Sequence, residues 1–157
     1  MKRILLLAAC LFSGGLLMAQ TNKEEIDLFQ SIFGMEKKAL IAEFIKVEGA
    51  EKDAFWKIYD DYEVKRKALG QRRISVLNKY VDSYATLDDL TTDEIVKEVI
   101  ALQSQNDKLI ADYYKKIKKD AGTKPAAQFY QIEGYLLSKI RAEIMENIPL
   151  IGDLDKK

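Results

Sequence analysis

Histidine is absent from the 157-residue chain, and there is one cysteine, one tryptophan and two prolines. Nucleophile–base pairs and zinc clusters are built mainly from His and Cys, so the chain lacks the residues for most of them. It also has no glycine-rich phosphate loop. Acidic and basic residues are equal in number, 25 each, whereas nucleic-acid-binding domains are strongly basic. The sequence therefore predicts a non-enzymatic protein without cofactor, metal or nucleic-acid partner.

Carboxylates are the remaining candidates for acid–base or metal chemistry, and two adjacent pairs occur. Asp60 and Asp61 lie in a predicted helix, where neighbours point about 100° apart and do not converge on one ligand. Asp88 and Asp89 lie in a predicted turn, where aspartate commonly makes local hydrogen bonds. A calcium ion would need about six or more oxygen ligands. We therefore interpret the first pair as part of a solvated helix face and the second as turn residues.

The first residues have the pattern of a secretory signal: a basic start, then an uncharged stretch from Ile4 to Ala19. We predict cleavage after Ala19. A membrane anchor remains an alternative, although the uncharged stretch is shorter than the roughly 20 residues of a spanning helix and is broken by Ser13–Gly15. Lipidation at Cys10, which ends a lipobox-like sequence, is the other alternative.

Residues 20–157 then form the mature chain, which is the length of one domain. Loss of Lys2 and Arg3 lowers the number of basic residues from 25 to 23 against 25 acidic ones, a net charge of −2. Cys10 is also lost, so the mature chain can form no disulfide. We expect a periplasmic location.

Apolar residues recur at helical spacing throughout, and no strand pattern competes with them. We predict an all-α fold with four helices at residues 24–47, 51–85, 92–120 and 125–147. The short connections favour antiparallel hairpins, and we expect an elongated molecule around the long second helix.

Local signals set the expected helix boundaries. Thr21 and Thr91 each precede a glutamate by three residues, as in a capping box. Gly49 is expected to end the first helix. Thr123 is the expected cap of the fourth helix, with Pro125 in its first turn.

The helix predicted at 51–85 has a mixed inward face, because two arginines interrupt its apolar stripe. The stripe consists of Phe55, Tyr59, Tyr62, Arg66, Leu69, Arg73, Val76 and Tyr80. Of the adjacent aromatics Phe55 and Trp56, we expect one in the core and one at its edge, and the same for Tyr113 and Tyr114.

The third and fourth helices also have one polar residue each on their stripes. The third stripe is Ile95, Val99, Leu102, Asn106, Leu109, Tyr113 and Ile117. We expect Asn106 to fix the register of packing and not to bind a ligand. The fourth stripe is Ala126, Phe129, Ile132, Glu133, Leu136, Leu137, Ile140, Ile144 and Ile148.

Basic residues gather at two places, residues 65–73 and 115–119. They are either solvated faces paired with acidic residues or a positive surface that attracts acidic or unfolded partners. Arg66 and Arg73 share one helix face and can instead pair with Glu133 or Glu143 inside the bundle. The candidate protein-binding surface consists of Arg66, Lys67, Arg72, Arg73 and Tyr80.

Three segments carry a family resemblance. Leu90-Thr91-Thr92-Asp93-Glu94 resembles the Leu-Thr-x-x-Gln motif of Spy/CpxP-type periplasmic proteins, with Glu94 in place of Gln. Residues 55–62 and 125–133, the latter followed by Ile148-Pro149-Leu150, resemble segments of related small secreted helical proteins. The resemblance implies helical hairpins that dimerise into a curved cradle. It also implies ATP-independent binding of unfolding proteins, or regulation of an envelope-stress sensor.

The residues alone predict a secreted helical protein without an active site. With the resemblance, we expect a periplasmic, ATP-independent protein-binding protein, a Spy-like chaperone or envelope-stress adaptor. The expected partners are unfolded or partly folded proteins, and the expected assembly is a homodimer. The alternative is a regulatory subunit that docks on the sensor domain of a membrane signalling protein, without general chaperone activity.

Overall fold

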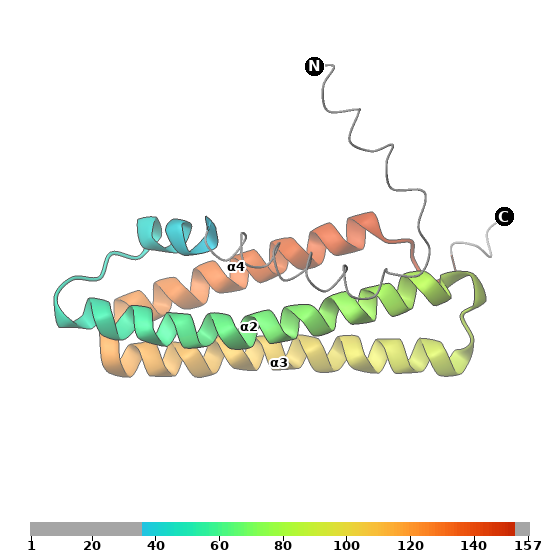
Figure 1. Ribbon diagram of the computed structural model, residues 1–157, viewed down its shortest axis with the longest axis horizontal. Helices are drawn as coiled ribbons and strands as arrows, with labels where there is room; N and C mark the ends of the chain where they lie inside the picture. Colours follow the sequence, from blue (N-terminus) through green and yellow to red (C-terminus); the bar gives the residue numbers. More distant parts are fainter. Residues whose placement is uncertain (1–35, 153–157) are drawn as a thin grey trace, which may run out of the picture. The chain divides into compact units, whose positions relative to one another are not determined.

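A computed structural model describes residues 36–152, and every regular element within this range is helical (Figure 1). A helical segment at residues 36–44 is followed by α2 (Ala50–Ser83), a short 3₁₀ helix η1 (Tyr84–Thr86), α3 (Asp89–Ala121) and α4 (Thr123–Asn147). The predicted all-α fold with four helices is confirmed. No helix of the described range is long and apolar enough to cross a membrane.

Several predictions fall outside the described residues. The signal peptide with its cleavage site, the alternative at Cys10, the Thr21 capping box and the part of the first helix at residues 24–35 all precede the described range. They stay predictions.

The first helix ends earlier than predicted. Its last helical residue is Phe44, not residue 47, and the backbone N–H of Ile45 donates to the carbonyl of Ile41 at 2.8 Å. Ile45 is still buried, 2 % exposed, because it packs into the core from the non-helical connection. Gly49 adopts a positive φ of 64° directly before α2, which glycine does without steric cost.

The start of α3 was also predicted wrongly. Asp88 caps the helix, because its carboxylate accepts a hydrogen bond of 2.7 Å from the N–H of Thr91, the residue we predicted as the cap. Asp88 has the extended backbone of a cap residue, so the helix begins three residues before the predicted position. Similarly, Thr123 is the first residue of α4, and the preceding Gly122 turns the chain with a φ of 96°.

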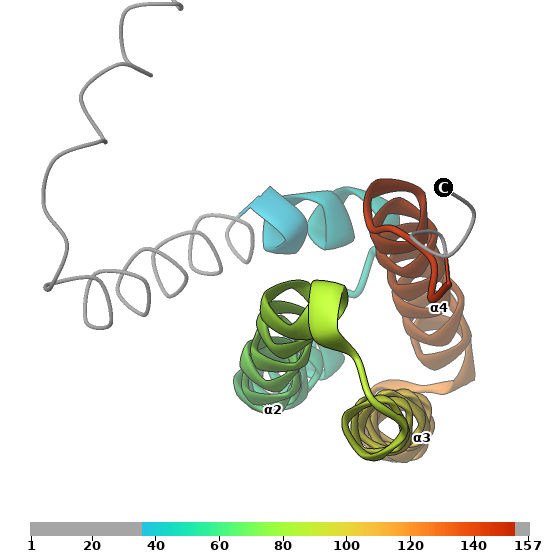
Figure 2. The same cartoon turned by 90° about the vertical axis from the view of Figure 1, so that its right-hand side faces the viewer.

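Of the three long helices, α3 contacts both of the others, α2 and α4. In Figure 1, α3 runs back along α2 and α4 runs back along α3, so α2 and α4 point in the same direction. α3 packs closely against both of its neighbours, whereas the backbones of α2 and α4 lie farther apart and these two helices meet through long side chains. Figure 2 shows the two helices on either side of α3, with residues 36–44 above the space between them.

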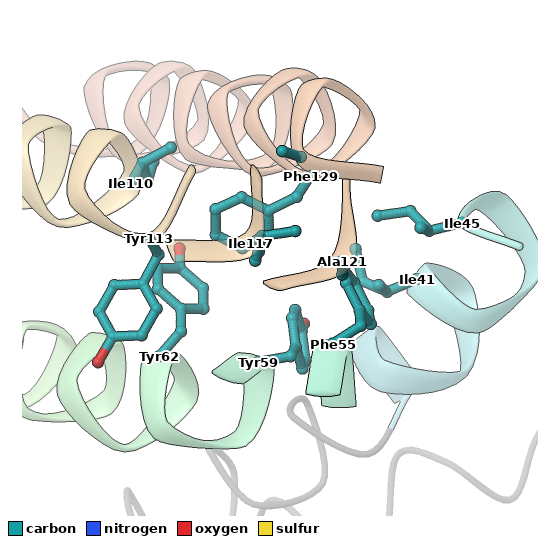
Figure 3. Packing of buried hydrophobic residues seen from close by; sticks show 11 residues of the cluster. Ile41, Ile45, Phe55, Tyr59, Tyr62, Ile110, Tyr113, Ile117, Ala121 and Phe129 are labelled. Atoms are coloured by element: carbon teal, nitrogen blue, oxygen red, sulfur yellow. The ribbon is translucent and has the colours of Figure 1, made fainter. Parts of the chain in front are cut away.

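Aromatic and aliphatic side chains from all four helices fill the end of this space nearest the start of α2 (Figure 3). The largest fully buried ones are Tyr59, Tyr62, Tyr113, Phe55, Phe129, Ile41 and Ile117. The aromatic pairs divide as predicted: Phe55 and Tyr113 are buried, while Trp56 and Tyr114 lie at the edge of the core.

Phe129 is the part of this core that α4 contributes between the tyrosines of α2. Its ring is edge-on to Tyr59 and Tyr62, with centroid distances of 6.3 and 5.0 Å, and it is not exposed.

We predict that Phe129→Ala lowers the free energy of unfolding by about 3–5 kcal/mol, because it leaves a cavity. Val64→Ala, at a side chain 69 % exposed on α2, should change it by less than about 0.5 kcal/mol. Urea unfolding of both variants measures this, and equal effects would contradict the packing.

Candidate functional site

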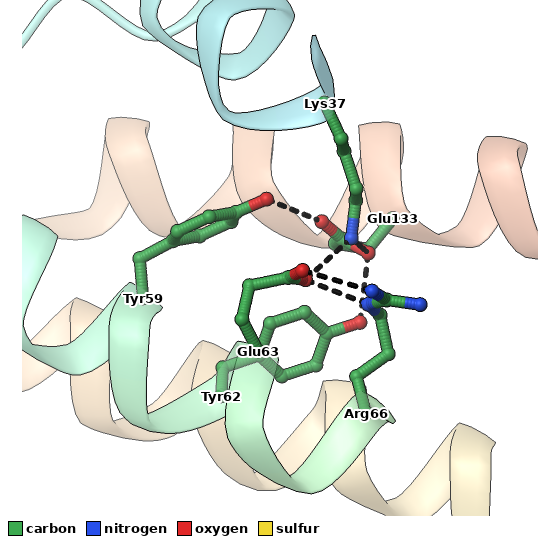
Figure 4. A network of polar contacts seen from close by, with 6 residues as sticks. All are labelled: Lys37, Tyr59, Tyr62, Glu63, Arg66 and Glu133. Carbon is green, nitrogen blue, oxygen red and sulfur yellow. Dashed lines mark hydrogen bonds and ion pairs between the residues drawn. The ribbon is translucent and has the colours of Figure 1, made fainter. Parts of the chain in front are cut away.

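A buried ionic cluster of Lys37, Glu63, Arg66 and Glu133 joins residues 36–44 to α2 and α4 (Figure 4). The Lys37 ammonium donates to Glu63 Oε1 and to Glu133 Oε2, at 2.7 Å each. The Arg66 guanidinium donates to both carboxylate oxygens of Glu63, at 2.8 and 3.0 Å. Lys37 is 4 % exposed and Glu133 is 2 % exposed. Ionic bonds in such a buried place are weakly screened by salt.

Two tyrosines of α2 complete the environment of Glu133. The Tyr62 hydroxyl donates to Oε2 at 2.7 Å, and the Tyr59 hydroxyl lies 3.5 Å from Oε1. Burial, followed by the negative charge of Glu133, raises the pKa of both tyrosines far above the ordinary value. Both hydroxyls therefore stay protonated and act as donors to Glu133.

The charges of the cluster stabilise one another against the cost of burial. Burial disfavours the ionised form of Glu63, but the hydrogen bonds and charges of Arg66 and Lys37 outweigh it and lower the pKa of Glu63. Burial likewise disfavours the Arg66 cation, and Glu63 reverses that effect and raises its pKa. Within the described range, no buried side-chain nitrogen or oxygen lacks a hydrogen-bond partner. We conclude that this cluster holds residues 36–44, α2 and α4 together.

A second group of charges lies at the surface between α2 and α3. The Tyr113 hydroxyl donates to Asp61, and the Lys65 ammonium donates to the Tyr113 oxygen at 2.7 Å and to Asp61 at 3.3 Å. The Lys116 ammonium lies 4.2 Å from the centroid of the Tyr113 ring. The hydrogen bond from Tyr113, with help from Lys65, lowers the pKa of Asp61. Part of each basic cluster is therefore paired within the chain.

The structure places three of the predicted surface residues in different surroundings. Arg66 belongs to the ionic cluster. The Arg72 side chain is half-exposed and bonds to α3, to Gln105 Oε1 at 2.8 Å and to Glu98 Oε2 at 3.0 Å. Lys67 is half-buried on α2. These three do not converge on one site.

Tyr80 is buried, 6 % exposed, and its hydroxyl donates to the carbonyl of Pro149 at 2.7 Å. Tyr84 makes the same kind of bond to the carbonyl of Leu150, at 2.8 Å. The two tyrosines thus hold the chain that follows α4 against the end of α2. A fifth predicted surface residue, Arg73, lines an open site.

That site is a groove of about 350 Å³ between α2, α3 and α4, which we call the open groove. It is lined by Arg73, Val76, Leu77, Val99, Leu102, Gln103, Arg141, Ile144, Met145 and Ile148. Its walls are almost entirely aliphatic, and its volume is within the range of ligand sites. It occupies the second half of α2 and of α4, whereas residues 36–44 pack on the first half of each.

Two arginines supply the charge of the open groove. Arg141 donates to Asp107 Oδ1 of α3 at 3.0 Å. Arg73 is half-buried and has no hydrogen-bond or ion-pair partner among residues 36–152. Burial, with repulsion from the Arg141 charge, lowers the pKa of Arg73, and Asp107 opposes this in part. The Arg73 guanidinium still carries its charge, because arginine is not deprotonated in proteins.

Sequence reasoning missed Lys37 and Arg141. Lys37 lies four residues before Ile41, on the same buried helix face. A charged residue on an apolar stripe was therefore the signal that could have indicated a buried ion pair. The same signal existed for Glu133, which the predicted stripe of the fourth helix included. Arg141 follows the stripe residue Ile140 directly, and nothing in the spacing placed it in a groove with Arg73.

Comparison of the chain with family models, with curated proteins and with solved structures finds no match. In the part of the chain that the structure describes, no group of three or more His, Cys, Asp or Glu side chains is arranged to hold a metal ion.

We predict that Lys37→Met lowers the free energy of unfolding by about 3–5 kcal/mol, because it leaves Glu133 buried without its cation. Lys38→Met is the matched control, since the ion pair of Lys38 with Asp60 is half-exposed and should contribute less than about 1 kcal/mol. The double variant Lys37→Met/Glu133→Gln should recover part of the loss. Urea unfolding measures all three, and equal effects of the two single variants would contradict the role of the cluster.

The lowered pKa of Glu63 predicts a dependence of stability on acid. The ordinary value is 4.5, and the folded value lies below it, so the stabilisation is complete above about pH 4.5 and is lost as the pH falls through the folded value. Urea midpoints between pH 7 and pH 3 should therefore fall less steeply for Glu63→Gln than for the wild type. Parallel curves would show that Glu63 does not contribute.

Proposed function

We propose that the protein binds other proteins, without enzymatic activity and without nucleotide, by holding an apolar helical segment of the partner in the open groove. One observation carries this proposal. The space between α2 and α4 is filled at one end by residues 36–44, and at the other end it is a groove with aliphatic walls.

Residues 36–44 indicate which kind of element fits this space. Their helix presents Ile41 to the core, together with one charged side chain, Lys37, that meets opposite charges on α2 and α4, and Ile45 packs beside it just after the helix ends. The same two helices, together with α3, form the walls of the open groove. An amphipathic helix in an apolar groove is a common mode of protein recognition.

The aliphatic surface is also exposed at the edges of the groove. Val99 on α3 is 48 % exposed and Met145 on α4 is 56 % exposed, and both line the groove. Apolar surface that remains open to solvent beside a groove is typical of interaction sites. A partner helix would remove these side chains from water.

Two forms of the proposal differ in the partner. The resemblance of residues 90–94 to the Spy/CpxP motif favours a periplasmic chaperone or stress adaptor, homodimeric and elongated, with unfolded proteins as clients. The limited volume of the groove and the unpaired cation at Arg73 favour the second form, a regulatory subunit that docks on one defined segment of a membrane sensor protein.

The chaperone form predicts that the protein suppresses aggregation of a denatured model protein at a few-fold molar excess. Met145→Asp should weaken this several-fold, because it places a charge in the apolar groove. Val64→Asp, at an exposed position of α2 outside the groove lining, should not. Light scattering measures aggregation. No suppression at several-fold excess would exclude the chaperone form, and equal effects of the two variants would exclude the groove as its site.

The docking form is tested by affinity capture from envelope extract with wild type and both variants. One stoichiometric partner that wild type and Val64→Asp retain, and that Met145→Asp loses, would support it. A partner retained by all three would exclude the groove.

A further inference from the structure

We infer that the open groove selects an amphipathic helix with an acidic side chain on its apolar face, placed to meet Arg73, and that it rejects a basic one. This inference rests on the proposed function and names the chemistry of the partner segment. The arrangement of charge along the groove carries it.

The groove has a cationic end and an aliphatic end. Because α2 and α4 run in the same direction, positions that follow one another along each helix also follow one another along the groove (Figure 1). Arg73 lies one turn before Val76 and Leu77 on α2, and Arg141 lies one turn before Ile144 on α4. Both guanidiniums are therefore at the end nearer the middle of the bundle, and the aliphatic rows extend away from them.

Arg73 is the charge that lacks a partner. Arg141 already donates to Asp107, while Arg73 is half-buried with no hydrogen-bond or ion-pair partner in the described chain. No buried side-chain nitrogen of the described range lacks a hydrogen-bond partner, so the guanidinium of Arg73 reaches solvent at the groove, where a carboxylate can accept its charge-assisted hydrogen bonds. A carboxylate at this end would also reduce the repulsion between Arg73 and Arg141, which contributes to the lowered pKa of Arg73.

The filled end of the same space has the opposite charge pattern. There the walls provide the carboxylates Glu63 and Glu133, and the helix that docks on them brings Lys37. At the open end two arginines, Arg73 and Arg141, outnumber the one carboxylate near them, Asp107, so the complementary helix brings an acid. Aliphatic side chains one and two turns beyond that acid would reach the rows of Val76 and Ile144.

The test uses three fluorescent peptides of about 15 residues with leucines at helical spacing. They are identical except for one residue on the leucine face, one turn before the first leucine, which is Glu, Gln or Lys. Affinity is measured by fluorescence anisotropy with wild type, Arg73→Gln and Arg72→Gln. Arg72 is the matched control, because it neighbours Arg73 and bonds to Glu98 outside the groove lining.

Wild type should bind the Glu peptide at least tenfold more tightly than the Gln peptide and should bind the Lys peptide most weakly. Arg73→Gln should remove the preference for Glu over Gln, and Arg72→Gln should keep it. Unchanged urea midpoints for the two variants would show that both are folded.

Other results separate this inference from the proposed function. Equal affinity for the three peptides would overturn the inference and leave the function standing, whereas no binding of any peptide would overturn both.

Binding of dodecanoate but of no peptide would assign the groove to a fatty acid. A wild-type dimer that Met145→Asp dissociates, measured by light scattering, would assign it to a second copy. Phe29 is an apolar residue of the predicted helix 24–47 and precedes the described range. Peptide binding that appears only in Phe29→Asp would assign the groove to the chain itself. Each of the last three overturns the inference.

Discussion

The two ionic bonds of Lys37, to Glu63 on α2 and to Glu133 on α4, determine how the space between these helices is used. Both bonds are buried, so the attraction between the charges is weakly screened by water. Loss of one partner leaves the other as an unpaired buried charge. They hold residues 36–44 over the first half of α2 and α4, where Ile41 and Ile45 close the aromatic core. The second half of the same two helices receives no such segment from residues 36–152 and forms the open groove. The site thus follows from where this one helix is held.

The sequence predicted the fold class well, because the stripes at three- and four-residue spacing report burial directly. Every residue of the predicted stripe of α2 is buried or half-buried, the two arginines included. The cap of α3 was predicted wrongly, because Asp88 and Thr91 are both good cap residues and spacing alone does not rank them. The site was predictable only in part. Arg73 was singled out as a charge on an apolar face, but its meeting with Arg141 depends on how α2 and α4 align across α3, which no local pattern encodes.

The basic residues show how packing changes the interpretation of charge. Lys65 and Lys116 gather around Tyr113 and Asp61, and Arg72 bonds across to α3. Such pairs at the surface contribute little stability each, but they leave less free positive charge to attract acidic partners at long range. Specificity in the proposed function therefore comes from a short apolar groove with one unpaired arginine, and not from a broad positive face.

Thiol accessibility tests the central claim most directly, since the chain from Gln20 onward has no cysteine of its own. Single cysteines are introduced at Leu77 in the open groove and at Ile117 in the filled core, and their reaction with a thiol reagent is followed under native conditions. The account predicts that Leu77→Cys reacts at least a hundredfold faster than Ile117→Cys, whose reaction requires unfolding. Equal protection of the two thiols would show that both halves of the space are filled, and would contradict the account.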